Sequence, residues 1–291
     1  MGTAESIGVL GATSQLGSCL LALFNQSGQK VVAFSRQAHS PANNHVEWYQ
    51  LGPDATTENT GSISKWIVVT PIWVLPTYFD LLEASGAQTL VAVSSTSRFT
   101  KIDSIDPAEQ AVAHRLIDSE AHVQEWAEAR GIDWVILRPT LIYGQGKDKN
   151  VTEITRFISR WRFFPILGKG DGLRQPVHVE DVAKACVAAL NPKTPKNWAY
   201  NISGAEALAY VDLVKRAFET LGMKPRFVHL PRWMFRLTLL VLGSLPRFRH
   251  WSIAMVDRMS RDMVFDHSDA KQAFGFKPRP FALGPEDLPK C

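Results

Sequence analysis

Residues 7–17 have the sequence IGVLGATSQLG, a pattern from which the architecture of the whole chain can be predicted. The apolar run Ile7–Leu10 predicts a buried strand, and apolar residues with helical spacing follow Gly17. Gly11 permits a tight turn and a close approach of the backbone to a phosphate. Gly17 permits the helix to pack on the sheet with its amino-terminal N–H groups directed at the phosphates. We predict a dinucleotide cradle.

The residues of this turn are the first predicted cofactor contacts. Ser14 stands where the usual G-x-x-G-x-x-G pattern has its middle glycine, and its hydroxyl can still donate a hydrogen bond to a phosphate. The alternative is a glycine-containing connection between a strand and a helix that binds no ligand. The predicted contacts in the turn are Gly11, Thr13, Ser14, Gln15, Leu16 and Gly17.

The end of the second predicted strand indicates which dinucleotide is bound. Residues 30–34 have the pattern of a buried parallel strand, and Ser35 and Arg36 follow them. An acidic residue at this place would bind the ribose hydroxyls of NAD, whereas a hydroxyl and a guanidinium would bind the 2′-phosphate of NADP. The sequence therefore favours NADP as the cofactor. The alternative is that Arg36 is an ordinary solvated side chain.

Composition limits the other classes of function. With 291 residues, 45% of them hydrophobic and 21% charged, the chain is long enough for one large domain or two. Its three cysteines lack metal-ligand spacing, and no His, Cys or Asp pattern predicts a metal site. The amino-terminus runs into the first strand without a secretion signal. We expect a cytoplasmic protein that binds a small molecule and no nucleic acid.

A basic, aromatic segment covers residues 231–251. Residues 224–291 contain 12 Lys and Arg against 6 Asp and Glu, while residues 1–223 contain 20 against 22. The apolar part of the segment is too short for a bilayer, which needs about 20 residues. Its side chains would suit peripheral contact with the inner face of an anionic membrane, or the phosphates of a substrate. The alternative is a buried helix with a basic rim.

Strands and helices alternate along the chain. This alternation predicts an α/β fold of the Rossmann type, a doubly wound parallel sheet with a smaller carboxyl-terminal substrate lobe. The predicted strands are residues 6–10, 30–34, 46–51, 65–70, 89–94 and 134–138, and the predicted helices are residues 15–26, 74–84, 107–130 and 180–190. We assign residues 1–144 and 175–203 to the dinucleotide-binding domain, and residues 145–174 and 204–291 to the lobe.

Four segments occur in a characteristic order. They are the glycine turn, VAVSST at residues 91–96, LRPTLIYG at residues 137–144 and QPVHVEDVA at residues 175–183. Together they resemble the signatures of the extended or atypical short-chain dehydrogenases/reductases of the NAD(P)-dependent epimerase/dehydratase family. The resemblance covers nearly the whole chain. It implies that the segment with Pro139 passes beside the nicotinamide and that Arg174 contacts the diphosphate of a nucleotide-sugar.

Further candidates follow from the rule that ligands bind at the carboxyl ends of parallel strands. Thr70 and Pro71 end the fourth predicted strand and, with Pro139, are predicted cofactor contacts. Ser95 and Thr96 follow the fifth strand, and Thr96 matches the catalytic Ser or Thr of the family. Both hydroxyls could bind a substrate oxygen, or both are plain turn residues.

The acid–base pair of the family is missing. These enzymes use a Tyr whose pKa is lowered by a Lys one helical turn later, and those positions fall at or near Val112 and Leu116. The literal Tyr-x-x-x-Lys at residues 143–147 contains glycines that argue against a helix, although Tyr143 could still border the nicotinamide and the substrate. His114 is the catalytic substitute that we consider, because its pKa suits proton transfer.

Two classes of function remain open. The first is an NADP-dependent oxidoreductase, epimerase or dehydratase that acts on a nucleotide-sugar or a similar small carbonyl or alcohol compound. The second is an inactive NADP-binding redox sensor or scaffold, like the accessory subunit of respiratory complex I that resembles this family. The missing Tyr and Lys favour the second class, whereas Arg174 and Thr96 favour the first. The resemblance also suggests a homodimer formed through the helices on either side of the Ser/Thr strand.

Overall fold

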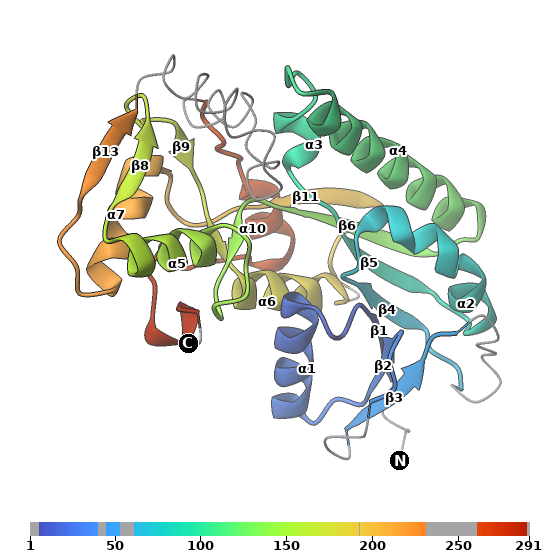
Figure 1. Cartoon of the computed structure of the whole chain (residues 1–291). Helices are drawn as coiled ribbons and strands as arrows, with labels where there is room; N and C mark the ends of the chain where they lie inside the picture. The colour runs from blue at the N-terminus through green and yellow to red at the C-terminus, as the bar shows by residue number, and fades with distance from the viewer. Residues whose placement is uncertain (1–5, 40–44, 53–60, 192, 231–260, 290–291) are drawn as a thin grey trace.

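The computed structural model describes residues 6–39, 45–52, 61–191, 193–230 and 261–289 (Figure 1). The basic segment 231–251 lies outside the described residues. Within the described ranges, no helix is both long enough and apolar enough to cross a membrane.

Seven parallel strands form the central sheet, in the order β11-β6-β5-β4-β1-β2-β3. The chain winds outward in both directions from the adjacent strands β1 and β4, which confirms the predicted doubly wound Rossmann fold. The strands are β1 (Ile7–Leu10), β2 (Val31–Ser35), β3 (Val46–Gln50), β4 (Lys65–Val68), β5 (Thr89–Val93), β6 (Asp133–Pro139) and β11 (Trp198–Ile202).

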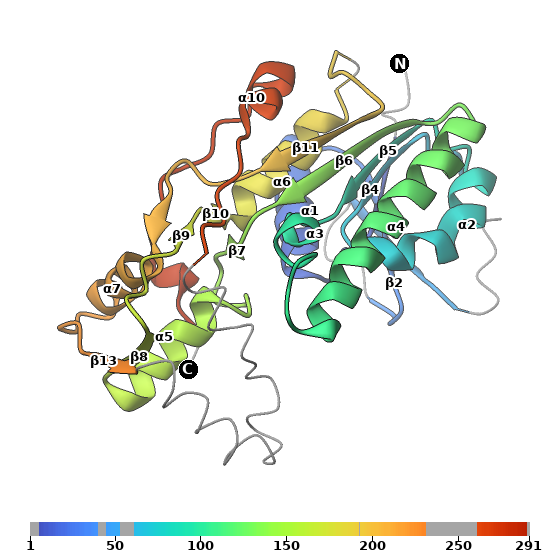
Figure 2. The same cartoon turned by 90° about the horizontal axis from the view of Figure 1, so that it is seen from above.

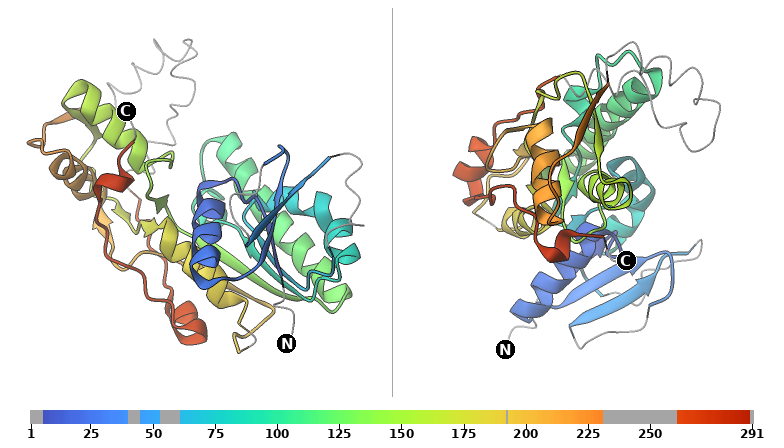
Figure 3. Two further views of the ribbon diagram at one scale, coloured as in Figure 1. Left: turned by 90° about the horizontal axis from the view of Figure 1, so that it is seen from below. Right: turned by 60° about the vertical axis from the view of Figure 1, so that its left-hand side comes forward.

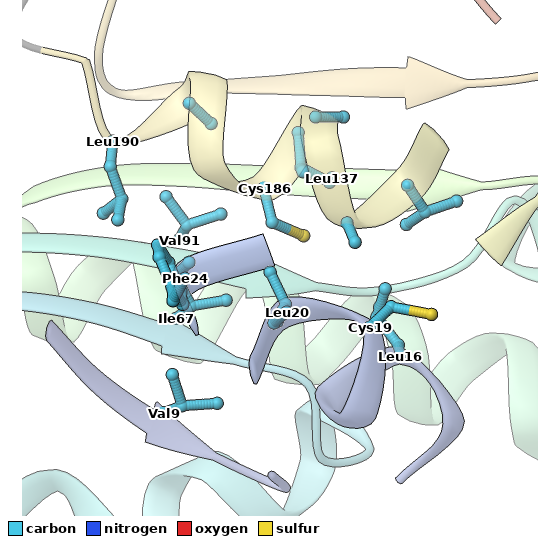
Figure 4. Close-up of a cluster of buried hydrophobic side chains, with 14 of the residues drawn as sticks. Val9, Leu16, Cys19, Leu20, Phe24, Ile67, Val91, Leu137, Cys186 and Leu190 are labelled. Atoms are coloured by element: carbon cyan, nitrogen blue, oxygen red, sulfur yellow. The ribbon is translucent and has the colours of Figure 1, made fainter. Parts of the chain in front are cut away.

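Helices cover both faces of the sheet (Figure 2). On one face α1 (Gln15–Ser27) packs beside α6 (Val179–Ala189) over the side chains of Val9 and Ile67 (Figure 4). On the other face α4 (Pro107–Ala129) and its neighbours cover Leu10 and the other strand residues that point to that face. Because successive strand residues point to opposite faces, Val9 and Leu10 belong to different cores.

Two differences from the prediction concern the sheet and its covering helices. The helix expected at residues 74–84 is a 3₁₀ segment, η2 (Ile72–Tyr78), followed by α2 (Phe79–Ala84). Pro76 lies inside η2, where its missing N–H and fixed φ are incompatible with a regular α-helix interior. Strand β11 was not among the predicted strands, since an edge strand with an exposed Trp198 lacks the continuous apolar run of the central strands.

The smaller lobe lies beside the sheet domain (Figure 3), and it has its own core. Ile158 on α5 and Phe218 on α7 are fully buried there, together with Tyr143. Its elements are β7 (Ile142–Tyr143), α5 (Val151–Trp161), β8 (Phe164–Leu167), β9 (Leu173–Arg174), β10 (Val177–His178), β12 (Leu208–Ala209), α7 (Tyr210–Thr220), β13 (Phe227–Leu230) and η4 (Pro285–Asp287). Strands β8 and β13 pair in parallel, as do β7 and β10.

One helix of the predicted lobe packs against the sheet domain. Helix α10 (Ser268–Phe274) contacts β11 and α6. Ala270 and Phe276 are buried in the same core as α1 and α6. Residues 268–276 therefore contribute to the core of the dinucleotide-binding domain, although the sequence analysis assigned them to the lobe.

Candidate functional site

Two glycines shape a backbone cradle between β1 and α1. Gly11 has a φ of +85°, and a Cβ at this position would lie 2.8 Å from the backbone nitrogen of Thr70. A Cβ at Gly17 would clash with the carbonyl oxygen of Gly11. Because all these neighbours are backbone atoms that cannot swing aside, both positions require glycine. The turn therefore lies directly against the strand end of β4.

Ser14 caps the helix that leaves this turn. Its Oγ accepts a hydrogen bond of 3.0 Å from the backbone N–H of Gly17. The hydroxyl hydrogen is still available for donation, at a helix end where the dipole favours negative charge. Thr13 is exposed at the turn, whereas Leu16 is buried in the core, so only the backbone of Leu16 can contact a ligand.

The side chain of Gln15 is directed elsewhere. Its amide donates a hydrogen bond to the carbonyl oxygen of Gly144, which follows β7. This contact joins the start of α1 to the connection into the lobe. The predicted cofactor contact of Gln15 is thus limited to its backbone in this arrangement.

Thr70 lies on the other side of the cradle, just after the carboxyl end of β4. Here the connections that follow β1 and β4 leave the sheet in opposite directions. Its Oγ1 is buried and has no hydrogen-bond partner in the described part of the chain. Pro71, beside it, is exposed. Buried hydroxyls are nearly always paired, so an unpartnered one beside a backbone cradle fits a ligand oxygen at this place. The residues present therefore fit a dinucleotide, whose phosphates the start of α1 would hold.

The carboxyl end of β2 carries the residues predicted to select the cofactor. Ser35 is 7% exposed, and its Oγ accepts a hydrogen bond of 3.1 Å from the N–H of Gln37. Arg36 is exposed. His39 was missed in the sequence analysis; its Nε2 lies 3.1 Å from the Ser35 Oγ, and its ring lies 4.4 Å from that of Trp48 at an interplanar angle of 31°. Its proximity to Ser35 is set by the path of the loop, for which the sequence has no periodic signal.

Two predicted residues meet at the ends of β5 and β6. Thr96 is 5% exposed, and its Oγ1 donates a hydrogen bond of 3.2 Å to the carbonyl oxygen of Pro139. Ser95 is half-buried, and its Oγ accepts a hydrogen bond from the N–H of Ser97 at the start of α3 (Ser97–Thr100). In this arrangement both hydroxyls support the local backbone. Thr96 would have to leave Pro139 to donate to a substrate.

His114 does not join this group. Its side chain is exposed on α4, while Glu120 on the same helix is 1% exposed and contacts Ser94 at the end of β5. Six residues along an α-helix correspond to a rotation of about 240°, so His114 is directed away from the face that carries Glu120. Val112 and Leu116, where the sequence analysis expected the Tyr and Lys of the family, pack against the core of the sheet.

Tyr143, a predicted substrate contact, is a core residue. Its side chain is fully buried against His178 and Phe281, and its hydroxyl accepts a hydrogen bond from the N–H of Ala282. Burial raises the pKa of Tyr143 to about 12, so the phenol stays protonated at neutral pH. With no exposed surface, Tyr143 offers nothing to a substrate in this structure.

Arg174, the other predicted substrate contact, is 6% exposed. One of its terminal nitrogens donates to the carbonyl oxygens of Leu173 and Arg261, at 2.8 and 2.9 Å. Its guanidinium also lies 5.7 Å from the ring of Tyr210. These contacts tie β9 to the segment that follows residue 260. A diphosphate contact by Arg174 stays a prediction.

A charged group lies at the same sheet edge, and the sequence analysis did not predict that its members meet. We call it the Glu120 cluster, and it consists of Ser94, Arg98, Glu120 and Arg138. The carboxylate of Glu120 accepts hydrogen bonds from the Ser94 hydroxyl, from Arg98, and from the Nε and Nη2 of Arg138 at 3.0 and 2.6 Å. The sequence has no spacing that links these residues, because Glu120 is one of five acidic residues in α4 and the two arginines lie on other elements.

Comparison with known proteins agrees with this geometry. The model of the NAD-dependent epimerase/dehydratase family matches residues 79–203. An uncharacterized protein of Sinorhizobium fredii is 28% identical over 207 residues, which cover 67% of this chain and 50% of that protein, so the match spans half the length of this relative. A UDP-glucose 4-epimerase of Vibrio cholerae is 22% identical over 250 residues, covering 85% of this chain and 71% of the enzyme.

Two further proteins are similar. A mitochondrial NADH dehydrogenase alpha subcomplex subunit of Arabidopsis thaliana is 28% identical over 141 residues, covering 48% of this chain and 31% of the subunit. The solved structure of the UDP-glucuronic acid 4-epimerase from Bacillus cereus in complex with NAD has a TM-score of 0.70 at 16% identity, covering 97% of this chain and 95% of that one. Residues 79–203 are thus similar to the NAD-dependent epimerase/dehydratase family, and the whole chain shares the fold of the Bacillus cereus structure, which agrees with the resemblance of the four signatures.

Proposed function

We propose that this chain binds NADP and acts as an epimerase/dehydratase-like oxidoreductase on a nucleotide-sugar or a similar small carbonyl or alcohol compound. The observation that supports it most is the cradle at the divergence of β1 and β4. There Gly11 and Gly17 are required by backbone contacts, and the buried hydroxyl of Thr70 has no partner among the described residues. In open parallel sheets, this divergence is where dinucleotides bind.

Each part of the site has a defined task in this proposal. The N–H groups at the start of α1 and the Ser14 hydroxyl hold the pyrophosphate. Ser35 and Arg36, with His39 beside them, bind the 2′-phosphate through charge-assisted hydrogen bonds. When bound, the nicotinamide supplies a hydride donor or acceptor. Thr96 exchanges its hydrogen bond to the Pro139 carbonyl for one to the substrate oxygen.

The choice of NADP rests on the end of β2. The similar structure from Bacillus cereus is named as a complex with NAD, and family membership fits either dinucleotide. What favours NADP here is the absence of a carboxylate at residues 35 and 36, where Ser35 and the exposed Arg36 stand. Discrimination of at least tenfold corresponds to about 1.4 kcal/mol.

Cofactor titration combined with a turnover assay tests the proposal. Quenching of intrinsic tryptophan fluorescence by NADPH and by NADH gives both affinities, and epimerisation or oxidation of UDP-glucose is then followed with the preferred cofactor. We expect NADPH to bind and a slow turnover to be measurable. Absence of binding by either dinucleotide would remove the basis of the proposal.

A cofactor-binding protein without turnover is the second candidate. One observation favours it: Val112 and Leu116, at the positions expected for the family's Tyr and Lys, pack against the core. The similarity to the Arabidopsis NADH dehydrogenase subunit also favours this second candidate. Tight binding of NADPH with no turnover of any nucleotide-sugar would select this redox-sensor or scaffold role. Homodimer formation stays a prediction under either function.

A further inference from the structure

The Glu120 cluster contains more positive charges than negative charges. Two guanidiniums, Arg98 and Arg138, face the single carboxylate of Glu120. The side chains of the two arginines are 19% and 16% exposed, and that of Glu120 is 1% exposed. Within the described ranges, no second acidic residue pairs with either arginine. A largely buried excess charge is unfavourable unless an anion compensates it.

Arg98 has a free edge with a recognisable geometry. It uses Nη1 for Glu120, while its Nε is buried without a hydrogen-bond partner in the described chain. The Nε and Nη2 of a guanidinium form the planar fork that binds a carboxylate with two parallel hydrogen bonds. Arg138 already directs this same pair of nitrogens at the Glu120 carboxylate. The corresponding edge of Arg98 is therefore built to take a second carboxylate.

The cluster lies at the ligand-binding edge of the sheet. Arg98 is two residues after Thr96, the proposed substrate contact, in the short helix α3. The ring of Phe99 lies 5.1 Å from the Arg98 guanidinium. It also lies 5.8 Å from the ring of Phe265, a residue that is distant in the sequence. Asn201 on β11, in register with Arg138, has a buried Oδ1 that is also without a partner. Unsatisfied polar atoms thus gather around this edge.

We propose that Arg98 binds a carboxylate of the substrate, so that the substrate is an acidic nucleotide-sugar, a nucleotide-linked uronic acid. This inference rests on the proposed function, because the nucleotide-sugar itself comes from there. The planar fork matches the geometry of carboxylates and of phosphates alike, so the experiment must separate these two oxyanions. Arg98 acts as a binding residue that selects the acidic sugar.

The test compares UDP-glucuronic acid with UDP-glucose, which differ by the carboxylate, in calorimetric titrations with NADPH present. The variants are Arg98→Gln, Arg98→Lys and the control Arg115→Gln, an exposed arginine that lies over the ring of Trp73. We expect the parent protein and the control to bind the acid at least tenfold more tightly. Arg98→Gln should abolish the preference, and Arg98→Lys, which keeps the charge without the fork, should retain only part of it.

Equal affinities for the two nucleotide-sugars in the parent protein, or a preference that survives Arg98→Gln, would overturn the carboxylate site while leaving the proposed function intact. If neither nucleotide-sugar binds, the proposed function fails, and free glucuronate, glucose and glucose 1-phosphate then test the site alone by ligand-observed NMR. Glucuronate binding that Arg98→Gln removes would still support the carboxylate site. Binding of glucose 1-phosphate but not glucuronate, or of none of the three, would overturn it.

Discussion

Replacing Gly11 by alanine tests the cofactor cradle most directly. The new Cβ would lie 2.8 Å from the Thr70 nitrogen and 3.0 Å from the Val69 carbonyl carbon, both backbone atoms. The φ of +85° adds strain of roughly 1–2 kcal/mol for any residue with a Cβ, and overpacking adds about 1–3 kcal/mol. The sum of about 2–5 kcal/mol is less than the stability of many domains, about 5–15 kcal/mol, so we expect Gly11→Ala to fold.

Binding should suffer more than folding does. Relief of the contact with Thr70 moves the turn that presents N–H groups to the phosphates, so we expect the NADPH dissociation constant to rise at least tenfold, about 1.4 kcal/mol. The assay is the tryptophan fluorescence titration, with urea unfolding measured in parallel. Gly28→Ala is the matched control, because Gly28 ends α1 with a φ of +69° and has nothing within 4 Å of an added Cβ.

The outcome separates two explanations. Unchanged NADPH affinity in Gly11→Ala would show that the glycine turn is not the cofactor site. Equal losses of affinity in Gly11→Ala and Gly28→Ala would attribute the effect to general destabilisation, since the second glycine is at the opposite end of the helix. Loss of affinity in Gly11→Ala alone supports the cradle.

Three further predictions have defined outcomes. Arg36→Ala should remove most of the preference for NADPH in the same titration, and equal affinities in the parent protein would refute the NADP assignment. Nucleotide-sugar turnover should be slow, because general acid–base help of about 10²- to 10⁴-fold is missing from its usual place; Thr96→Ala should lower any rate, while His114→Ala, on the exposed side of α4, should not. Burial alone would raise the pKa of Asp287, but hydrogen bonds from His178 and from two backbone N–H groups hold it below its usual value of 3.8. These hydrogen bonds therefore stabilise the fold above pH 3.8, and their contribution is lost as the pH falls through the lowered pKa of Asp287. Asp287→Asn should lower the free energy of unfolding in urea by about 1–3 kcal/mol at pH 7 and by less at pH 3. A loss that does not depend on pH would contradict the assignment.

Local features of the chain were enough to predict much of this molecule. Strand β1, the Gly11 turn and helix α1 are consecutive, so their apolar spacing and their glycines are readable without knowledge of the rest of the fold. The parallel sheet followed from the same kind of alternation. The glycine turn could be predicted because its parts are held together by the covalent chain within seven residues, from Gly11 to Gly17, whereas its role as a cofactor site stays a prediction.

Contacts between distant residues were beyond the reach of such patterns. Glu120 meets Ser94 and Arg138 across 26 and 18 residues, and it does so because α4 packs over the ends of β5 and β6. The burial of Tyr143 and the rotation of His114 away from Thr96 likewise depend on how whole helices and strands are placed. Side-chain spacing along one element specifies which face a residue lies on, but the partner on that face is set by the packing of elements that the chain brings together only on folding.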